Sequence, residues 1–170
     1  MKKLFLIILV FIGAQSVFAQ NEINLEEIIN SKKFIFQARS AYPQNSYDIT
    51  EILRRIPGSV SSSKIDLDPN IYNVKFNSNE INAYLPYYGR SFSGNNGLNE
   101  GGNKFISNKF SENIKKNKKG VYHINYQIKD VFSTREIILE IQPNGNSILF
   151  INSMNRESIS YDGIIKAIKE

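Results

Sequence analysis

The strongest structural signal lies between Gly120 and Ile151, in the stretch GVYHINYQIKDVFSTREIILEIQPNGNSILFI. Apolar and polar residues alternate within it over 122–129 and again over 136–142. This period of two is typical of strands that bury one face and hydrate the other. Asn144-Gly145 follows the second strand and predicts a tight two-residue hairpin, because both residues tolerate positive φ angles.

Weaker signals of the same kind precede this stretch. Residues 34–38 alternate as FIFQA and predict a strand that ends at Tyr42-Pro43. A hairpin is predicted further on, with one strand at 65–67, a turn at Asp68-Pro69-Asn70 and a return strand over 72–76.

Two short helices are predicted near the N-terminus. Asn24 can cap a helix that runs through Asn30, with Glu26 and Glu27 in the first turn, where the helix dipole favours acidic residues. Residues 48–57 place their aliphatic side chains at the i, i+3, i+4, i+7 spacing of one helical face and end at a proline that is followed by glycine.

The C-terminal part predicts one more strand. After a turn at Asn155-Arg156, a short strand is expected over 158–161, and the tail beyond Gly163 is expected to form a helical turn or a fraying strand. The whole pattern predicts a mainly β fold, an antiparallel meander of about seven or eight strands with one or two short helices near the N-terminus. Such a meander can form a curved sheet, a sandwich or a partial barrel.

The first residues are typical of a secretory signal peptide. Lys2 and Lys3 precede an apolar run over 4–12, and Val17-Phe18-Ala19 offers small residues at the −3 and −1 positions of a cleavage site. The run of about nine residues is far shorter than the roughly 20 that a membrane-spanning helix needs. Cleavage is therefore favoured over a retained membrane anchor.

The predicted organisation is a signal peptide over 1–19 and a single β-rich domain over 20–170. We expect the protein to be exported, to the periplasm or beyond the cell, without stable membrane insertion after cleavage. The chain contains no cysteine, so neither disulfides nor thiolate chemistry can stabilise this domain.

Charge gives little indication of a partner. The formal net charge is +5 and most charges are scattered along the chain. The one dense basic group lies over 115–119, just before Gly120, where a solvated hairpin loop explains it better than a phosphate-binding patch. No nucleic-acid partner is predicted, because such domains concentrate their basic residues on one face.

The residue types needed for catalysis or metal binding are sparse. His123 is the only histidine and falls on the polar side of its strand. Residues 66–70 resemble the start of a calcium loop, but Ile71 stands where that loop needs glycine and Asn77 where it needs a bidentate carboxylate. No catalytic residue, metal site or cofactor is predicted.

The most distinctive segment is YLPYYGR over 84–90, which precedes a loop rich in Gly and Asn over 94–102. The segment resembles part of the DUF4251 family, a group of secreted Bacteroidota proteins of unknown function, and the resemblance covers about residues 25 to 165. The resemblance implies an exported or periplasmic β-rich domain and brings no activity or catalytic residue. It rests on strand 71–76, residues 85–90, Gly101-Gly102, Phe105, Asn155-Arg156, Ile159, Tyr161 and Gly163.

The tyrosine-rich segment has a structural and a functional interpretation. In the structural one, Pro86 and Gly89 shape the backbone while the tyrosine rings pack on the sheet and their hydroxyls reach water or carbonyls. In the functional one, aromatic rings and Arg90 form a recognition surface. The loop over 94–102 is either a disordered connection or part of such a surface. The candidate binding residues are Tyr84, Tyr87, Tyr88, Arg90, Arg156 and Tyr161.

Three functions stay open at this point. The favoured one is an exported, non-enzymatic domain that binds a small molecule, a glycan or an envelope protein. The second is a cell-envelope hydrolase that gathers carboxylates from separate strands, and the third is an assembly protein that pairs through a sheet edge.

Export has a direct test. The exported protein should begin at Gln20, because cleavage is expected after Ala19. N-terminal sequencing and the intact mass of protein from the periplasmic and culture fractions measure this. Full-length protein that retains Met1 and accumulates in the cytosol contradicts the prediction.

Overall fold

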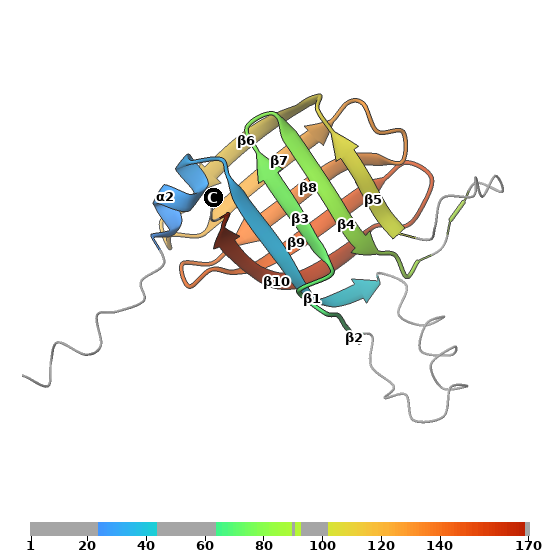
Figure 1. Ribbon diagram of the computed structural model, residues 1–170, viewed down its shortest axis with the longest axis horizontal. Helices are drawn as coiled ribbons and strands as arrows, with labels where there is room; N and C mark the ends of the chain where they lie inside the picture. The colour runs from blue at the N-terminus through green and yellow to red at the C-terminus, as the bar shows by residue number, and fades with distance from the viewer. Residues whose placement is uncertain (1–23, 44–63, 90, 93–101, 169–170) are drawn as a thin grey trace, which may run out of the picture.

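The computed structural model describes residues 24–43, 64–89, 91–92 and 102–168. These residues form one short helix and ten antiparallel strands (Figure 1), which confirms the mainly β prediction. The signal peptide, the predicted helix over 48–57 and most of the loop over 94–102 lie outside the described residues. The elements are α2 (Leu25–Asn30), β1 (Phe34–Pro43), β2 (Ile65–Asp66), β3 (Asn73–Asn77), β4 (Glu80–Pro86), β5 (Gly102–Ser107), β6 (Phe110–Lys116), β7 (Tyr122–Ile128), β8 (Thr134–Ile141), β9 (Asn146–Ser153) and β10 (Ile159–Ala167).

The strands form a single, nearly closed barrel. Their order is β5-β4-β3-β1-β10-β9-β8-β7-β6, with β2 paired to β1 off this path. The first long strand therefore pairs with the last, and the two ends of the order are β5 and β6. These two strands are consecutive in the chain. The opening of the barrel therefore lies between two strands from the middle of the chain, and not between the first and the last long strand.

The passage from β5 to β6 is a corner and not a hairpin. Every pairing along the order is antiparallel, so β5 and β6 run in the same sense. Asp130 supports the corner, because its carboxylate accepts hydrogen bonds from Ser107 Oγ at 2.5 Å and from the backbone N–H groups of Asn108 and Lys109 at 2.8 and 3.0 Å. These bonds, led by that from Ser107, hold the pKa of Asp130 below its ordinary value.

The core lies between two crossing layers of strands. In Figure 1, β3 and β4 cross in front of β8 and β9. A row of aromatic rings connects the layers: Phe34 stacks on Phe76 at 4.9 Å, Phe76 on Tyr126 at 5.0 Å, and Phe110 meets Tyr126 edge-on at 5.8 Å. Offset and edge-on geometries of this kind add to the stabilisation that burial alone provides.

The helix α2 covers one end of the barrel, and it is capped as predicted. Asn24 Oδ1 accepts a hydrogen bond from the N–H of Glu27 at 3.2 Å, and Leu25 and Ile29 are buried in the core. Glu26 pairs with Lys116 of β6 at 2.8 Å. In the described part of the chain, no helix is long and apolar enough to span a membrane.

The predicted hairpin between 65–67 and 72–76 is wrong. β2 pairs with Ser40 and Ala41 of β1, whereas β3 pairs with residues 34–37 of the same strand. The two short strands thus follow one another along β1 in the same direction.

The turn between β2 and β3 has the predicted chemistry but a different role. The Asp68 carboxylate accepts a hydrogen bond from the N–H of Asn70 at 2.9 Å, and its carbonyl accepts one from Ile71 at 3.1 Å. Opposite it, β1 has a bulge at Arg39, between Ala38 and Ser40. The turn carries the chain past that bulge, where the ladder is interrupted.

The hairpin at Asn144-Gly145 exists, but its geometry differs from the prediction. Among the described non-glycine residues only Lys32 has a positive φ, so Asn144 does not adopt the left-handed conformation. Gly145 alone does, at φ 83°, and its N–H donates to the Gln142 carbonyl at 2.9 Å. Pro143 explains the difference, because its ring holds φ near −65° and favours a type I turn closed by a glycine bulge.

The neighbouring hairpin at the same end of the barrel, between β6 and β7, repeats this geometry. Gly120 has a φ of 78°, and its N–H donates to the Asn117 carbonyl at 3.0 Å. The lysine-rich residues 115–119 end β6 and form this turn, as predicted. The C-terminal strand is longer than expected, because β10 continues beyond Gly163 to Ala167 in the ladder with β1.

At Gly163, β10 lies too close to β1 to leave room for a side chain. A Cβ atom at this position would lie 2.2 Å from the Gln37 carbonyl oxygen and 2.7 Å from the ring of Phe36. Real side chains do not tolerate such distances, so the backbone of one strand would have to move.

We therefore expect Gly163→Ala to lower the free energy of unfolding by about 2 to 3 kcal/mol, as overpacking of a dense core does. Urea denaturation measures this, with Lys166→Ala on an exposed position of the same strand as the control, expected to change stability by less than about 0.5 kcal/mol. Equal stabilities of the two variants contradict the close-approach argument.

Candidate functional site

Tyr161 lies inside the barrel and links three elements. Its side chain on β10 is fully buried. The hydroxyl donates a hydrogen bond to the Pro86 carbonyl at 2.6 Å and accepts one from Asn103 Nδ2 at 2.9 Å. Burial raises the pKa of Tyr161, so the hydroxyl stays protonated and able to donate.

Tyr87 and Arg156 extend this arrangement toward the rim of the barrel. The Tyr87 hydroxyl donates to the Glu157 carbonyl at 3.0 Å, and burial raises the pKa of Tyr87 to about 12. The guanidinium of Arg156 lies 5.0 Å from the centroid of the Tyr87 ring, and Arg156 Nη1 donates to the Gly102 carbonyl at 3.1 Å. Tyr87, Arg156 and Tyr161 are called the tyrosine clamp below.

Gly89 serves this clamp in a different way from the one predicted. Its φ is not in the left-handed range, so no unusual backbone angle requires glycine there. The requirement is space, because a Cβ at Gly89 would lie 2.4 Å from the Tyr87 hydroxyl oxygen. The clamp thus holds β4, β5 and the β9–β10 connection together, which favours the structural interpretation of these tyrosines.

Of the two further candidate tyrosines, Tyr84 lies on the surface, whereas Tyr88 is half-buried and packs against the core. Tyr84 is 42% exposed and stacks on Tyr72 with ring centroids 6.0 Å apart, while Lys104 Nζ lies 4.6 Å above the Tyr84 ring. Burial, followed by the proximity of Tyr72, raises the pKa of Tyr88. The sixth candidate, Arg90, lies outside the described residues.

A second polar arrangement lies on the outer face of β7, β8 and β9. Glu136 Oε1 accepts hydrogen bonds from Asn125 Nδ2 and Gln127 Nε2, both at 2.6 Å, and Glu136 Oε2 accepts one from Asn152 Nδ2 at 2.8 Å. Gln127 Nε2 also donates to Asn125 Oδ1 at 3.0 Å. Asn125, Gln127, Glu136 and Asn152 are called the amide cluster below.

The carboxylate of Glu136 organises this cluster. Hydrogen bonds from Asn125 and Asn152 are the main reason why the pKa of Glu136 lies below its ordinary value. The carboxylate therefore stays ionised and can only accept hydrogen bonds, which forces the NH₂ group of each amide to face it. The orientation of the amides is thus set before any ligand arrives.

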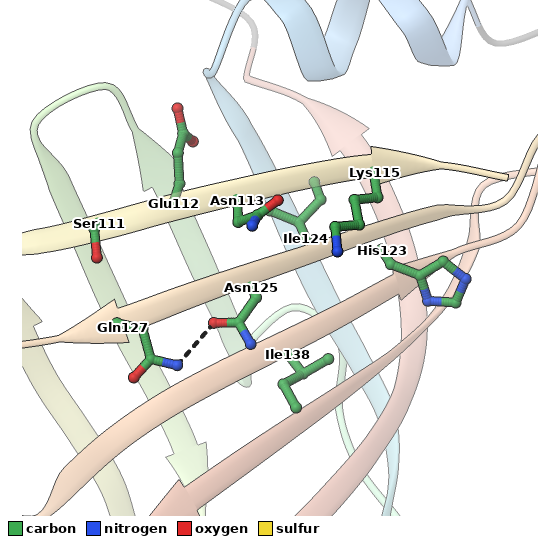
Figure 2. Close-up of a pocket in the computed structure, with 9 residues that line it drawn as sticks. All are labelled: Ser111, Glu112, Asn113, Lys115, His123, Ile124, Asn125, Gln127 and Ile138. Atoms are coloured by element: carbon green, nitrogen blue, oxygen red, sulfur yellow. Dashed lines mark hydrogen bonds between the residues drawn. The ribbon is translucent and has the colours of Figure 1, made fainter.

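A concavity of about 540 Å³ lies beside the amide cluster, over β6, β7 and β8. Asn125 and Gln127 belong to both, and Figure 2 shows the hydrogen bond between them. Glu112 points away from Ser111 in this view and pairs with Lys32 near α2. The volume falls within the range of roughly 300 to 1,000 Å³ that is usual for ligand sites. The lining residues are Ser111, Glu112, Asn113, Lys115, His123, Ile124, Asn125, Gln127 and Ile138.

Comparison with known proteins gives the family of this chain. The model of a domain of unknown function, DUF4251, matches residues 17–165. The chain belongs to the DUF4251 family. The crystal structure of a DUF4251 family protein from Bacteroides eggerthii DSM 20697 matches with 13% identity over 84% of each chain, at a TM-score of 0.55. That similarity shows a shared fold, and no curated protein matches the chain.

The acidic residues of this DUF4251 protein do not form a catalytic pair on the outer face of β8. Glu136 and Glu140 are four residues apart on one strand, which separates them by about 13 Å. Glu140 Oε2 instead lies 3.7 Å from His123 Nδ1. Among the described residues, no group of three or more His, Asp or Glu side chains is placed to hold a metal ion.

Sequence reasoning missed the amide cluster in this DUF4251 protein. It placed Asn125 and Gln127 on the wet face of their strand, where polar residues need no special explanation. The signal that could have found the cluster is the pairing of Gln127 with Glu136 and of Glu136 with Asn152 across three strands. That pairing depends on the register of the strands, which alternation alone does not determine.

The tyrosine clamp generates a stability prediction. Tyr161→Phe removes one hydroxyl and leaves the Pro86 carbonyl and the Asn103 amide without their partner. We expect the free energy of unfolding to fall by about 1 to 3 kcal/mol. The matched control is Tyr84→Phe, whose hydroxyl lies on a partly exposed ring, with an expected change below about 0.5 kcal/mol. If chemical denaturation ranks the two variants in the opposite order, the clamp is not what holds this region.

Proposed function

We propose that this DUF4251 protein is an exported, non-enzymatic binding domain that recognises a hydroxyl-rich ligand, such as a glycan, in the concavity over β6, β7 and β8. The observation that carries the proposal is the set of amide groups that Glu136 holds in fixed orientation beside that concavity. Export is supported by the signal-peptide pattern of residues 1–19.

The chemistry of the lining favours a polar, uncharged ligand. Amide side chains present both donors and acceptors, and so do the hydroxyl groups of a sugar. Once Gln127 Nε2 has donated to both Glu136 and Asn125, its carbonyl oxygen is left to accept from a ligand. Because the amides are already oriented, less side-chain entropy is lost when a ligand binds.

The neighbouring residues extend the surface in two directions. Asn113 pairs with Asn125 across β6 and β7, and adds another amide to the lining. Ile138 lies opposite Asn125 on β8 and faces Phe150 on β9, so an apolar strip borders the amides. Polar groups beside such a strip suit a sugar ring, which has hydroxyl edges and apolar faces.

The two alternative functions have less support. A glycosidase needs two carboxyl groups facing one another about 5 to 10 Å apart, and Glu136 already accepts three amide hydrogen bonds and stays ionised. Assembly through a sheet edge would use β5 or β6, the ends of the strand order. Two ion pairs, Lys32 with Glu112 and Glu26 with Lys116, connect β6 to residues near α2. Charged side chains on an edge strand such as β6 disfavour pairing with another strand.

A binding experiment tests the proposal. The processed protein is screened on an array of bacterial and plant glycans, and the strongest ligand is titrated by calorimetry. We expect Gln127→Ala and Asn125→Ala each to weaken binding about tenfold, because each loses hydrogen bonds to the ligand and to the cluster. Glu136→Gln should also weaken binding, because the amides lose the acceptor that orients them.

The control is Asn82→Ala, which removes an amide from the outer face of β4 in the other layer of the barrel. Its affinity should equal that of the wild type. The proposal fails if no glycan on the array binds above background, or if the Asn82 and Gln127 variants lose affinity equally.

A further inference from the structure

Three large apolar side chains at one end of the barrel are largely exposed. Phe132 is 83% exposed, Phe92 69% and Met154 66%. They come from three separate connections, those between β4 and β5, β7 and β8, and β9 and β10. Single exposed apolar residues are ordinary on protein surfaces, whereas contiguous groups mark interaction sites.

Backbone hydrogen bonds make these residues neighbours. The N–H of Phe92 donates to the Asn155 carbonyl at 2.8 Å, which places Phe92 next to Met154. The N–H of Met154 donates to the Ser133 carbonyl at 3.4 Å, which places Met154 next to Phe132. The three residues therefore lie on neighbouring backbone segments at this end of the barrel, and they are here called the apolar rim.

The apolar rim lies at the end of the barrel opposite α2. The connections that follow β7 and β9 emerge at this end, whereas the turns that follow β6 and β8 lie at the other end, where Lys116 meets Glu26 of α2. Figure 1 shows the helix at the left of the barrel and the connections from β7 to β8 and from β9 to β10 at the right.

Basic side chains surround the apolar rim. Lys109, Lys129 and Arg135 are exposed, and the N–H of Lys129 donates to the Lys109 carbonyl at 2.9 Å, so these two lysines lie side by side. Among the described acidic residues of these connections, Asp130 is exposed and its carboxylate supports the β5–β6 corner, while Glu157 is half-buried. Among the described residues named here, three exposed cations therefore outnumber one exposed carboxylate.

We propose that the apolar rim binds the surface of an anionic lipid bilayer, with Phe92, Phe132 and Met154 inserted among the lipids and the basic residues on the headgroups. Apolar tips next to cations gain from both the hydrophobic effect and the negative surface potential of such a bilayer. A second copy of this chain fits less well, because an end-to-end contact would bring the lysines of both copies together.

The first test measures binding to vesicles. The exported, processed protein is sedimented with vesicles of phosphatidylcholine that contain phosphatidylglycerol. We expect the double variant F132S/M154S to bind at least about tenfold more weakly, because each lost side chain removes apolar area from the interface. The matched control is Ile106→Ser, which removes a 55% exposed apolar side chain from the outer face of β5 and should leave binding unchanged.

The second test measures the electrostatic contribution. Lys129→Gln should weaken binding and reduce its sensitivity to salt, because one cation fewer faces the headgroups. Lys118→Gln, in the turn at the α2 end, has the same charge change and should have no effect. All variants share one N-terminus, so differences between them cannot arise from the N-terminal segment.

The third test reports the orientation of the bound protein. The chain has no cysteine, so Ser133→Cys and Lys118→Cys each offer a single site for an environment-sensitive fluorophore. Vesicles should shift the emission of the Ser133→Cys label to the blue and leave that of the Lys118→Cys label unchanged.

The proposal is overturned if wild-type protein does not bind the vesicles at low salt, if both labels shift equally, or if F132S/M154S binds as the wild type does. It is also overturned if sedimentation velocity shows dimers that F132S/M154S abolishes, since a second copy would then occupy the rim.

Discussion

The pairing of β1 with β10 is the constraint on which the rest of this structure depends. It joins the two ends of the described chain into one ladder, from Phe34 with Ala167 to Pro43 with Ile159. The strands approach so closely at Gly163 that no side chain fits between them. Because β1 and β10 pair with each other, the opening of the barrel lies at the β5–β6 corner instead. There the Asp130 carboxylate accepts hydrogen bonds from the backbone N–H groups of Asn108 and Lys109.

The pairing of β1 with β10 also determines which polar side chains are buried inside the barrel. Tyr161 projects from β10 into the barrel, where an unpaired hydroxyl would be costly, and the Pro86 carbonyl and Asn103 amide satisfy it. Arg156 and Tyr87 continue the same pattern at the rim. Residue types that often anchor interfaces here stabilise the fold, so their abundance in a sequence does not by itself identify a binding site.

The outer surfaces are therefore more informative about function than the tyrosine-rich segment. The amide cluster and the apolar rim lie on different parts of the barrel and have different chemistry, one polar and preorganised, the other apolar and bordered by lysines. The shared DUF4251 fold does not choose between such functions, because function depends on the site and not on the scaffold.

The sequence by itself determined the local structure: the alternating strands from Tyr122 to Ile141, the capped helix at Asn24, the glycine turns and the family. These features depend on side-chain periodicity and on turn residues within short segments, and both can be recognised in a sequence without knowledge of the fold. The pairing of β1 with β10, the placement of β2 and β3 along one strand, and the encounter of Glu136 with its three amides arise only in the tertiary structure. They depend on strand register and on contacts between distant residues, and alternation is compatible with many registers until the core selects one.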